Sequence, residues 1–203
     1  MVINIRGTSG SGKTTVVRGI MAKGVVTPFG GTTKKPDFYS INLTPAIERP
    51  VIVVGSYENV CGGCDSISTQ DEICDRIRAG ASMGHVLVEG LLMSHLFSRY
   101  AMLDRELAAQ NIPFIWAFLD TPIDVCLARV VERREARGNF SPLNEKNTRD
   151  KWNDMHSVFD KATKQRERDW KIVIGHKIAK LDARWVDHTN AVEQIFSWLS
   201  VPA

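Results

Sequence analysis

Eight consecutive residues have the types and spacing of a phosphate-binding loop. Positions 7–14 read Gly-Thr-Ser-Gly-Ser-Gly-Lys-Thr and match the pattern G-x-x-x-x-G-K-[ST] in full. In such a loop the glycines let backbone N–H groups turn toward a phosphate chain, the lysine reaches the outer phosphates, and the hydroxyl can ligate Mg²⁺. The predicted nucleotide contacts are Gly7, Thr8, Ser9, Gly10, Ser11, Gly12, Lys13, Thr14 and Thr15, with Thr14 also a metal ligand.

A carboxylate at the end of an apolar run is the second candidate. Residues 85–89 read His-Val-Leu-Val-Glu, and a glycine follows. In a phosphate-loop protein, an acidic side chain at the exit of a buried strand is placed to hold Mg²⁺, directly or through water, and it can polarise an attacking hydroxyl. We therefore expect Glu89 to be a metal and catalytic residue. A plain surface carboxylate at a strand end is the alternative.

Four arginines follow a Thr-Pro signal for the start of a helix. Arg129, Arg133 and Arg137 recur every four residues, so they would share one helical stripe, and Arg134 lies beside them. Guanidinium groups bind phosphate oxygens and stabilise the charge that spreads over them during phosphoryl transfer. A Gly-Asn pair after the stripe is a plausible hinge, and we predict a closing lid over about 129–145. A solvated helix face with local ion pairs is the alternative.

The segment after the second apolar run contains the candidate acceptor side. Two adjacent glycines there indicate a turn, or a close approach of the backbone to a ligand. Asp65 follows them and can accept a hydrogen bond from a substrate hydroxyl, so it is the candidate base; an aspartate that only caps a turn is the alternative. Tyr57 can stack on a nucleobase or pack at the surface. Lys34 and Lys35 can meet an acceptor phosphate or remain in solvent.

Cysteine spacing offers one further motif. Cys61 and Cys64 have the C-x-x-C spacing, and Cys74 and Cys126 are isolated. A zinc site needs two more ligands at suitable spacing, and no second C-x-x-C or H-x-x-x-H is present. Free thiols in a reducing compartment are therefore favoured over a metal or redox role.

These side chains must be positioned by alternating strands and helices, the pattern of a parallel sheet covered on both faces. Ligands of such sheets bind at the carboxyl ends of the strands, where the candidate residues fall. An additional hairpin strand is predicted at 37–43. The other predicted strands are 2–6, 50–56, 85–89, 113–119 and 184–188, and the predicted helices are 13–22, 69–79, 98–110, 122–137, 144–168 and 190–200.

Length and composition predict one soluble domain. The chain has 203 residues, 43% hydrophobic content and a net charge of +3. The longest strongly apolar run, 112–119, is too short to span a bilayer, and the first residues lack a signal-peptide layout. We expect a cytoplasmic protein with no membrane partner. Residues 161–180 hold seven basic side chains against two acidic ones, which predicts either a polyanion-contact surface or a solvated helix face.

Three segments of the chain resemble the phosphate-loop kinase superfamily. They are the phosphate loop, the Val-Glu-Gly strand end, and the run from Leu119-Asp120-Thr121-Pro122 through the arginine helix. The resemblance covers residues 2–20, 85–90 and 113–138. It implies an α/β fold of three layers, α/β/α, with a five-stranded parallel sheet of order 2-3-1-4-5 and a single domain over residues 1–203. It also implies ATP as donor, Mg²⁺ as cofactor, Arg129 as a nucleotide contact, and Arg133 and Arg137 as lid residues that close over the phosphates.

The acceptor region resembles that of virus-encoded DNA kinases, which phosphorylate hydroxymethyluracil in DNA. The matching features are Gly-x-Tyr, then Gly-Gly-x-Asp, then a Gln-Asp-Glu helix start. The resemblance implies a modified-pyrimidine DNA acceptor and a location in the host cytoplasm. A segment at about 139–180 would then be an added DNA-contact element, and its basic residues would bind phosphates more weakly as salt rises.

Together these features predict an ATP-dependent kinase whose catalytic residues are Lys13, Asp65, Glu89, Arg133 and Arg137. A small-molecule nucleoside or nucleotide kinase is the first alternative, because the Val-Glu-Gly strand end also resembles uridine kinases and phosphoribulokinases. A nucleotide-dependent binding protein without an acceptor is the second. The acceptor and the oligomeric state are left open by the sequence.

Overall fold

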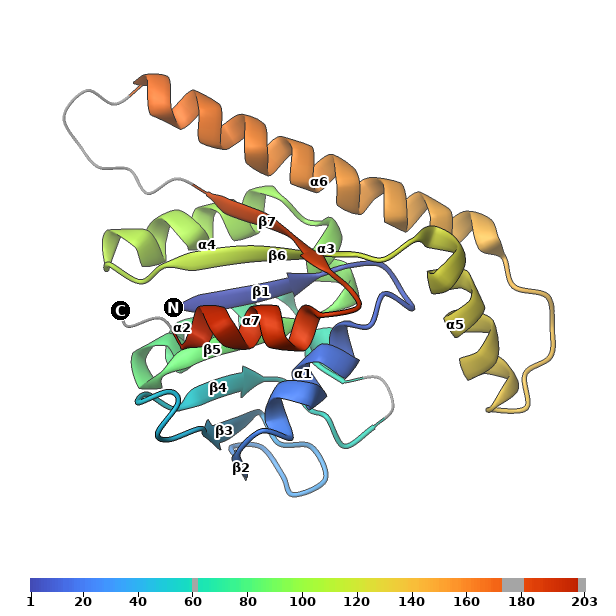
Figure 1. Ribbon diagram of the computed structural model, residues 1–203, viewed down its shortest axis with the longest axis horizontal. Coiled ribbons are helices and arrows are strands. Elements are labelled where there is room, and N and C mark those ends of the chain that lie inside the picture. Colours follow the sequence, from blue (N-terminus) through green and yellow to red (C-terminus); the bar gives the residue numbers. More distant parts are fainter. Residues whose placement is uncertain (60–61, 173–180, 201–203) are drawn as a thin grey trace.

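The computed structural model describes residues 1–59, 62–172 and 181–200, and for 165–172 it describes the backbone only. The chain forms an α/β fold in which one mixed sheet lies between helices (Figure 1). Its strands are β1 Val2–Arg6, β2 Val25–Phe29, β3 Phe38–Asn42, β4 Val51–Val54, β5 His85–Glu89, β6 Phe114–Asp120 and β7 Asp182–Asp187.

The helices divide between the two faces of this sheet. One core cluster joins α2, α3, α4 and α6 to one face, and a second joins α1 and α7 to the other. The α-helices are α1 Lys13–Met21, α2 Gln70–Met83, α3 Leu91–His95, α4 Ser98–Ala109, α5 Ile123–Glu135, α6 Glu145–Ile172 and α7 Ala191–Leu199, and a short 3₁₀ turn spans Cys64–Ser66.

The expected five-stranded, wholly parallel sheet is wrong in strand count and order. The sheet has seven strands in the order β2-β3-β4-β5-β1-β6-β7. β3, the predicted hairpin strand, pairs antiparallel with β4 and with β2, whereas β4, β5, β1, β6 and β7 are mutually parallel. β2 was not predicted because Val-Val-Thr-Pro-Phe is short, contains a proline and lacks alternation of apolar and polar residues. Proline is tolerated in a sheet mainly in edge strands, and β2 is an edge strand.

The parallel strands bring three candidate segments to one edge of the sheet. β1 lies between β5 and β6, with Ile5 opposite Glu89 on one side and Ala117 on the other. The phosphate loop leaves β1, Glu89 ends β5, and the arginine helix α5 follows β6. The carboxyl ends of neighbouring parallel strands meet, so residues more than 100 positions apart in sequence converge there.

A buried arginine supports the phosphate loop from the core. Arg6, the last residue of β1, is fully buried, and its guanidinium stacks 3.9 Å from the centre of the Trp116 ring. It donates a hydrogen bond to the Leu96 carbonyl at 3.1 Å. Burial lowers the pKa of Arg6 to about 9, so the group remains charged at neutral pH. The contacts tie the start of the loop to the segment between α3 and α4.

The long helix α6 is attached to the same edge. The Thr8 hydroxyl donates to the Thr148 carbonyl at 3.4 Å, and the Trp152 indole donates to the Thr121 carbonyl at 3.1 Å. Figure 1 shows α6 in orange, extending along one face of the sheet from α5. In the part of the chain that the structure describes, no helix is both long and apolar enough to cross a membrane.

Candidate active site

A cavity of about 810 Å³ lies at the carboxyl edge of the parallel strands. The phosphate loop and the first turn of α1 form one wall through residues 9–16. The loop after β7 and the first turn of α7 form another through residues 188–193. The remaining lining side chains are Arg18, Asp65, Glu89, Leu91, Arg129 and Arg133.

The phosphate loop is shaped by close backbone contacts that only glycine permits. Gly10 and Gly12 have φ angles of 80° and 98°, in the left-handed region. A Cβ on Gly10 would lie 2.2 Å from the Cys126 carbonyl oxygen, so the loop packs directly against α5. The Ser11 hydroxyl is buried and has no hydrogen-bond partner among the described residues. An open loop with such a free hydroxyl fits a phosphate chain.

Lys13 folds back over the loop from which it arises. Its ammonium donates to the carbonyls of Gly7 at 2.9 Å and Thr8 at 3.1 Å. Burial lowers the pKa of Lys13, whereas the carboxylates of Glu89 and Asp65 act in the opposite direction. The Lys13 ammonium, which lines the cavity, is thus placed among phosphate-loop carbonyls, where an anionic phosphate can replace them.

Glu89 lies directly beside Thr14, the second residue of α1. The Thr14 hydroxyl donates to Glu89 Oε1 at 2.8 Å. Burial raises the pKa of the Glu89 carboxyl to about 7, while Lys13 and the Thr14 hydrogen bond oppose the rise. A hydroxyl and a carboxylate oxygen at this separation are hard oxygen donors, the type that Mg²⁺ prefers.

Asp65 also lines this cavity, next to the residues that follow Glu89. Its Oδ1 accepts a hydrogen bond from the Leu91 amide at 2.6 Å, so it caps the start of α3. The contact is with the start of a helix 26 residues away and not with a turn of its own segment, and the base role of Asp65 stays a prediction.

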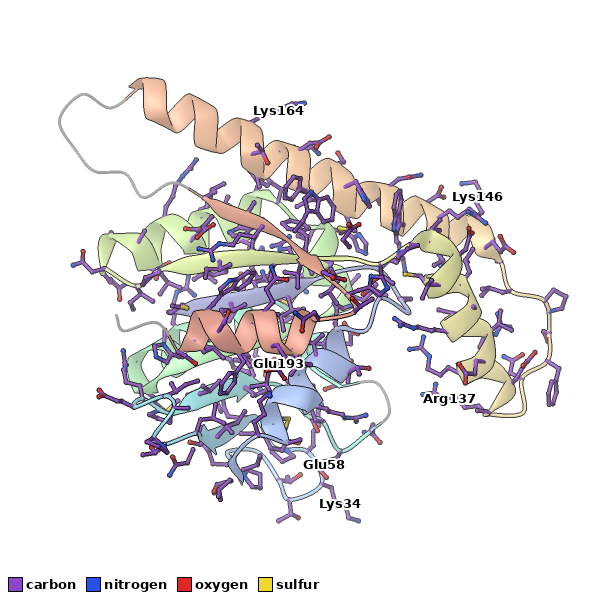
Figure 2. The ribbon with its side chains drawn as sticks, in the orientation of Figure 1. Lys34, Glu58, Arg137, Lys146, Lys164 and Glu193 are labelled. Carbon is purple, nitrogen blue, oxygen red and sulfur yellow. The ribbon has the colours of Figure 1, made fainter. Side chains whose placement is uncertain are left out.

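The arginine stripe divides into two parts. Arg129 donates to the Gly10 carbonyl at 3.3 Å and lines the cavity with Arg133. Arg134 instead donates to the Asn139 side chain at 3.3 Å. Arg137 is not a lining residue: α5 ends at Glu135, so the stripe does not continue to it. Figure 2 shows the Arg137 side chain beside the lower end of α5.

The cysteines that the structure describes are buried free thiols: Cys64, Cys74 and Cys126. Burial raises the pKa of the Cys64 thiol well above its usual value. Cys61 lies outside the described residues, so the predicted C-x-x-C motif cannot be placed as a pair. Among the described side chains, no group of three or more His, Cys, Asp or Glu residues converges as a metal site.

Sequence relatives decide the family. No known protein-family profile matches the chain. A 5-hmdU DNA kinase of Pseudomonas phage PaMx11 is 36% identical over 158 residues, which span 74% of this chain and 79% of the relative. The chain belongs to the 5-hmdU DNA kinase family. The resemblance to phosphate-loop and virus-encoded DNA kinases is therefore confirmed, and the protein is a kinase.

Other members of the 5-hmdU DNA kinase family show similar identities. The kinase of Delftia phage PhiW-14 is 32% identical over 173 residues, 79% of this chain and 63% of the relative. That of Pseudomonas phage M6 is 31% identical over 168 residues, 79% of this chain and 84% of the relative. Among solved structures, a deoxyadenosine kinase from M. mycoides with bound dATP aligns with a TM-score of 0.41 and 14% identity, over 99% of this chain and all of that one.

Sequence reasoning missed how closely one glycine approaches the Glu89 carboxylate of this kinase. Gly63 has a φ of 82°, and a Cβ there would lie 2.7 Å from Glu89 Oε1 and 2.6 Å from its backbone oxygen. The adjacent glycines were noted as a turn or a close approach, but only the folded chain identifies what is approached. Arg18, which donates to the Tyr57 carbonyl at 2.9 Å and lines the cavity, had no motif to reveal it.

We expect Gly63→Ala to lower both kcat and thermal stability, because a methyl group would displace the Glu89 carboxyl and strain the left-handed backbone. The expected loss in kcat is at least about tenfold. Gly138→Ala is the matched control, since Gly138 also has a positive φ, 74°, but nothing within 4 Å of a Cβ. If both variants behaved alike, backbone strain alone would explain the effect and the contact with Glu89 would be unimportant.

We expect Arg133→Ala to reduce kcat by about 10²-fold in this kinase, because we predict that the guanidinium of this cavity-lining residue stabilises charge on the transferring phosphoryl group. Arg134→Ala is the matched control: the two residues are adjacent on α5, but Arg134 bonds Asn139 and does not line the cavity. Steady-state rates with saturating ATP provide the measurement. Equal rates for the two variants would argue against a role for Arg133.

Proposed function

We propose that this kinase transfers the γ-phosphate of ATP to the hydroxymethyl group of 5-hydroxymethyluracil in DNA. The observation that carries the proposal is the convergence of a complete phosphate loop, Glu89, Arg133 and a second carboxylate, Asp65, on one cavity. Membership of the 5-hmdU DNA kinase family supports the choice of acceptor.

In the proposed reaction the hydroxymethyl oxygen attacks the γ-phosphorus, and the bond from that phosphorus to the β–γ bridging oxygen breaks, so that ADP leaves. Lys13 and the loop amides bind the phosphates, and Asp65 receives the hydroxyl proton. Arg133 offsets charge on the phosphoryl oxygens. Thr14 and Glu89 would hold Mg²⁺, which would supply charge neutralisation at the phosphates. Positioning and electrostatic stabilisation provide most of the rate enhancement in such transfers.

The predicted DNA-contact segment is only partly described. On α6 the side chains of Lys161 and Lys164 are described, and Figure 2 shows Lys164 pointing away from the sheet. Near the start of α6, Lys146 pairs with Asp150 at 2.6 Å, so its charge is offset. The side chains of Arg166, Arg168 and Lys171, and the whole of Lys177 and Lys180, lie outside the described residues. A DNA role for this segment stays part of the proposal.

The test is transfer of labelled γ-phosphate from ATP to a panel of acceptors. The panel comprises DNA with hydroxymethyluracil, the same DNA with thymine, free nucleosides, and nucleoside monophosphates. We expect label on the modified DNA alone, with rates that fall as salt rises. Label on thymine DNA as well would indicate strand ends as the acceptor, and label only on a nucleoside or nucleotide would identify a small-molecule kinase. ATP hydrolysis that no acceptor changes would indicate a binding protein.

A further inference from the structure

The Tyr57 hydroxyl is buried and has no hydrogen-bond partner among the described residues. The side chain is 7% exposed. Leaving a buried hydroxyl unpaired costs free energy, and such groups call for an explanation. Two other buried tyrosines are paired: the Tyr39 hydroxyl donates to Glu58 and the Tyr100 hydroxyl to Gln70, both at 2.7 Å. Tyr57 therefore departs from the pattern of this fold.

The Tyr57 ring is held in place on several sides. Its amide donates to the Tyr39 hydroxyl at 2.9 Å, and the two rings pack edge to face with centres 5.9 Å apart. Arg18 donates to the Tyr57 carbonyl. A Cβ on Gly62 would lie 2.4 Å from the Tyr57 ring, so the turn covers the ring directly. The hydroxyl thus lacks a partner although its ring is fixed.

The same turn joins Tyr57 to the Glu89 carboxylate. Gly62 contacts the Tyr57 ring, and the next residue, Gly63, contacts the Glu89 carboxyl. Among ionisable groups, Glu89 has the largest electrostatic effect on the Tyr57 hydroxyl, and Arg18 and Asp65 also act on it. All three of these charged residues line the cavity. The turn therefore places the Tyr57 ring and the Glu89 carboxyl against two successive glycines, although Tyr57 is not itself a lining residue of the cavity.

Glu89 already has one hydrogen-bond donor in this structure. Glu89 Oε1 accepts from the Thr14 hydroxyl. In the proposed function the Thr14 hydroxyl turns to the metal and phosphates, and Glu89 then loses its donor. We propose that Tyr57 is a positioning residue, whose hydroxyl donates to the Glu89 carboxylate in the nucleotide-bound enzyme. The role of Thr14 in this argument rests on the proposed function.

The test compares Tyr57→Phe with Tyr100→Phe in the full-length protein. Thermal unfolding is recorded without nucleotide, then with a non-hydrolysable ATP analogue, with and without Mg²⁺. We expect Tyr57→Phe to leave the nucleotide-free Tm unchanged or higher, because it removes an unpaired hydroxyl. We also expect it to diminish the Mg²⁺-dependent part of the analogue's stabilisation and to lower kcat about tenfold at unchanged KM for DNA. Tyr100→Phe should lower the nucleotide-free Tm and leave the other two quantities unchanged.

The proposal would be overturned if Tyr57→Phe kept the full Mg²⁺-dependent stabilisation that the ATP analogue gives the wild type. It would also be overturned if Tyr57→Phe kept the wild-type kcat and its nucleotide-free Tm fell as far as that of Tyr100→Phe. The thermal shift needs no acceptor. If wild-type protein fails to phosphorylate modified DNA but Tyr57→Phe loses the shift, the proposed acceptor is wrong and the role of Tyr57 stands.

Discussion

Lys13→Ala is expected to reduce kcat by at least about 10³-fold while the protein stays folded. The ammonium lines the cavity, and its hydrogen bonds go to two carbonyls of its own loop, those of Gly7 and Thr8. Alanine removes the charge that phosphates would meet, and the hydrogen bonds that it breaks lie within the loop itself. Initial rates with labelled ATP, together with circular dichroism, provide the measurement.

Lys35→Ala is the matched control for this prediction. The Lys35 ammonium also donates to a backbone carbonyl, that of Ser66 at 3.0 Å, but Lys35 does not line the cavity. We expect wild-type kcat for this variant. A Lys13→Ala protein with wild-type turnover would remove the basis for assigning phosphoryl transfer to this loop.

Glu89→Gln is expected to lose at least about 10²-fold in kcat and yet gain stability at alkaline pH. Burial raises the pKa of the Glu89 carboxyl from 4.5 to about 7. A raised pKa means that the fold disfavours the ionised form, so the wild type loses stability as pH rises from 4.5 to 7 and no further above it. Glutamine cannot ionise and can still accept the Thr14 hydrogen bond. Without metal or nucleotide, the variant should be more stable by less than about 1 kcal/mol at pH 5 and by about 3 kcal/mol at pH 8.

Urea denaturation across pH 5–8.5 measures this difference. Glu106→Gln is a control of opposite sign, because a hydrogen bond from Arg78 lowers the pKa of the Glu106 carboxyl. The exposed ion pair between Glu106 and Arg78 stabilises the wild type above pH 4.5. Glu106→Gln should therefore not become more stable than the wild type as pH rises. A Glu89→Gln protein less stable than wild type at pH 8 would indicate that Glu89 is ionised and paired with Lys13 in the free enzyme.

Local sequence signals were sufficient for the donor side of the site. The glycines and Lys13 form a contiguous motif, and Glu89 directly follows an apolar run, so neither required knowledge of distant contacts. Arg133 followed from helical spacing. Arg137 shared that spacing, but the helix ends at Glu135, and helix ends are poorly specified by periodicity. The roles of these residues in catalysis remain predictions.

The acceptor side was harder to predict because its features depend on tertiary packing. Tyr57 was interpreted as a base-stacking or surface tyrosine, whereas it is a core residue against Tyr39. Asp65 was interpreted as a base or a turn cap, but its Leu91 partner lies 26 residues away. β2 and the five-residue helix α3 carry weak local patterns and form because neighbouring elements pair with them or pack against them.

The central place of β1 in the sheet has a consequence for synthesis on the ribosome. Val2 pairs with Val86 on one side and Phe114 on the other, so the strand that emerges earlier than either partner must wait for both. Contacts between residues so far apart are slow to form, since a long loop must close first. The phosphate loop therefore cannot acquire its final shape until β5 and β6 have left the exit tunnel, and nascent chains shorter than this should not bind ATP.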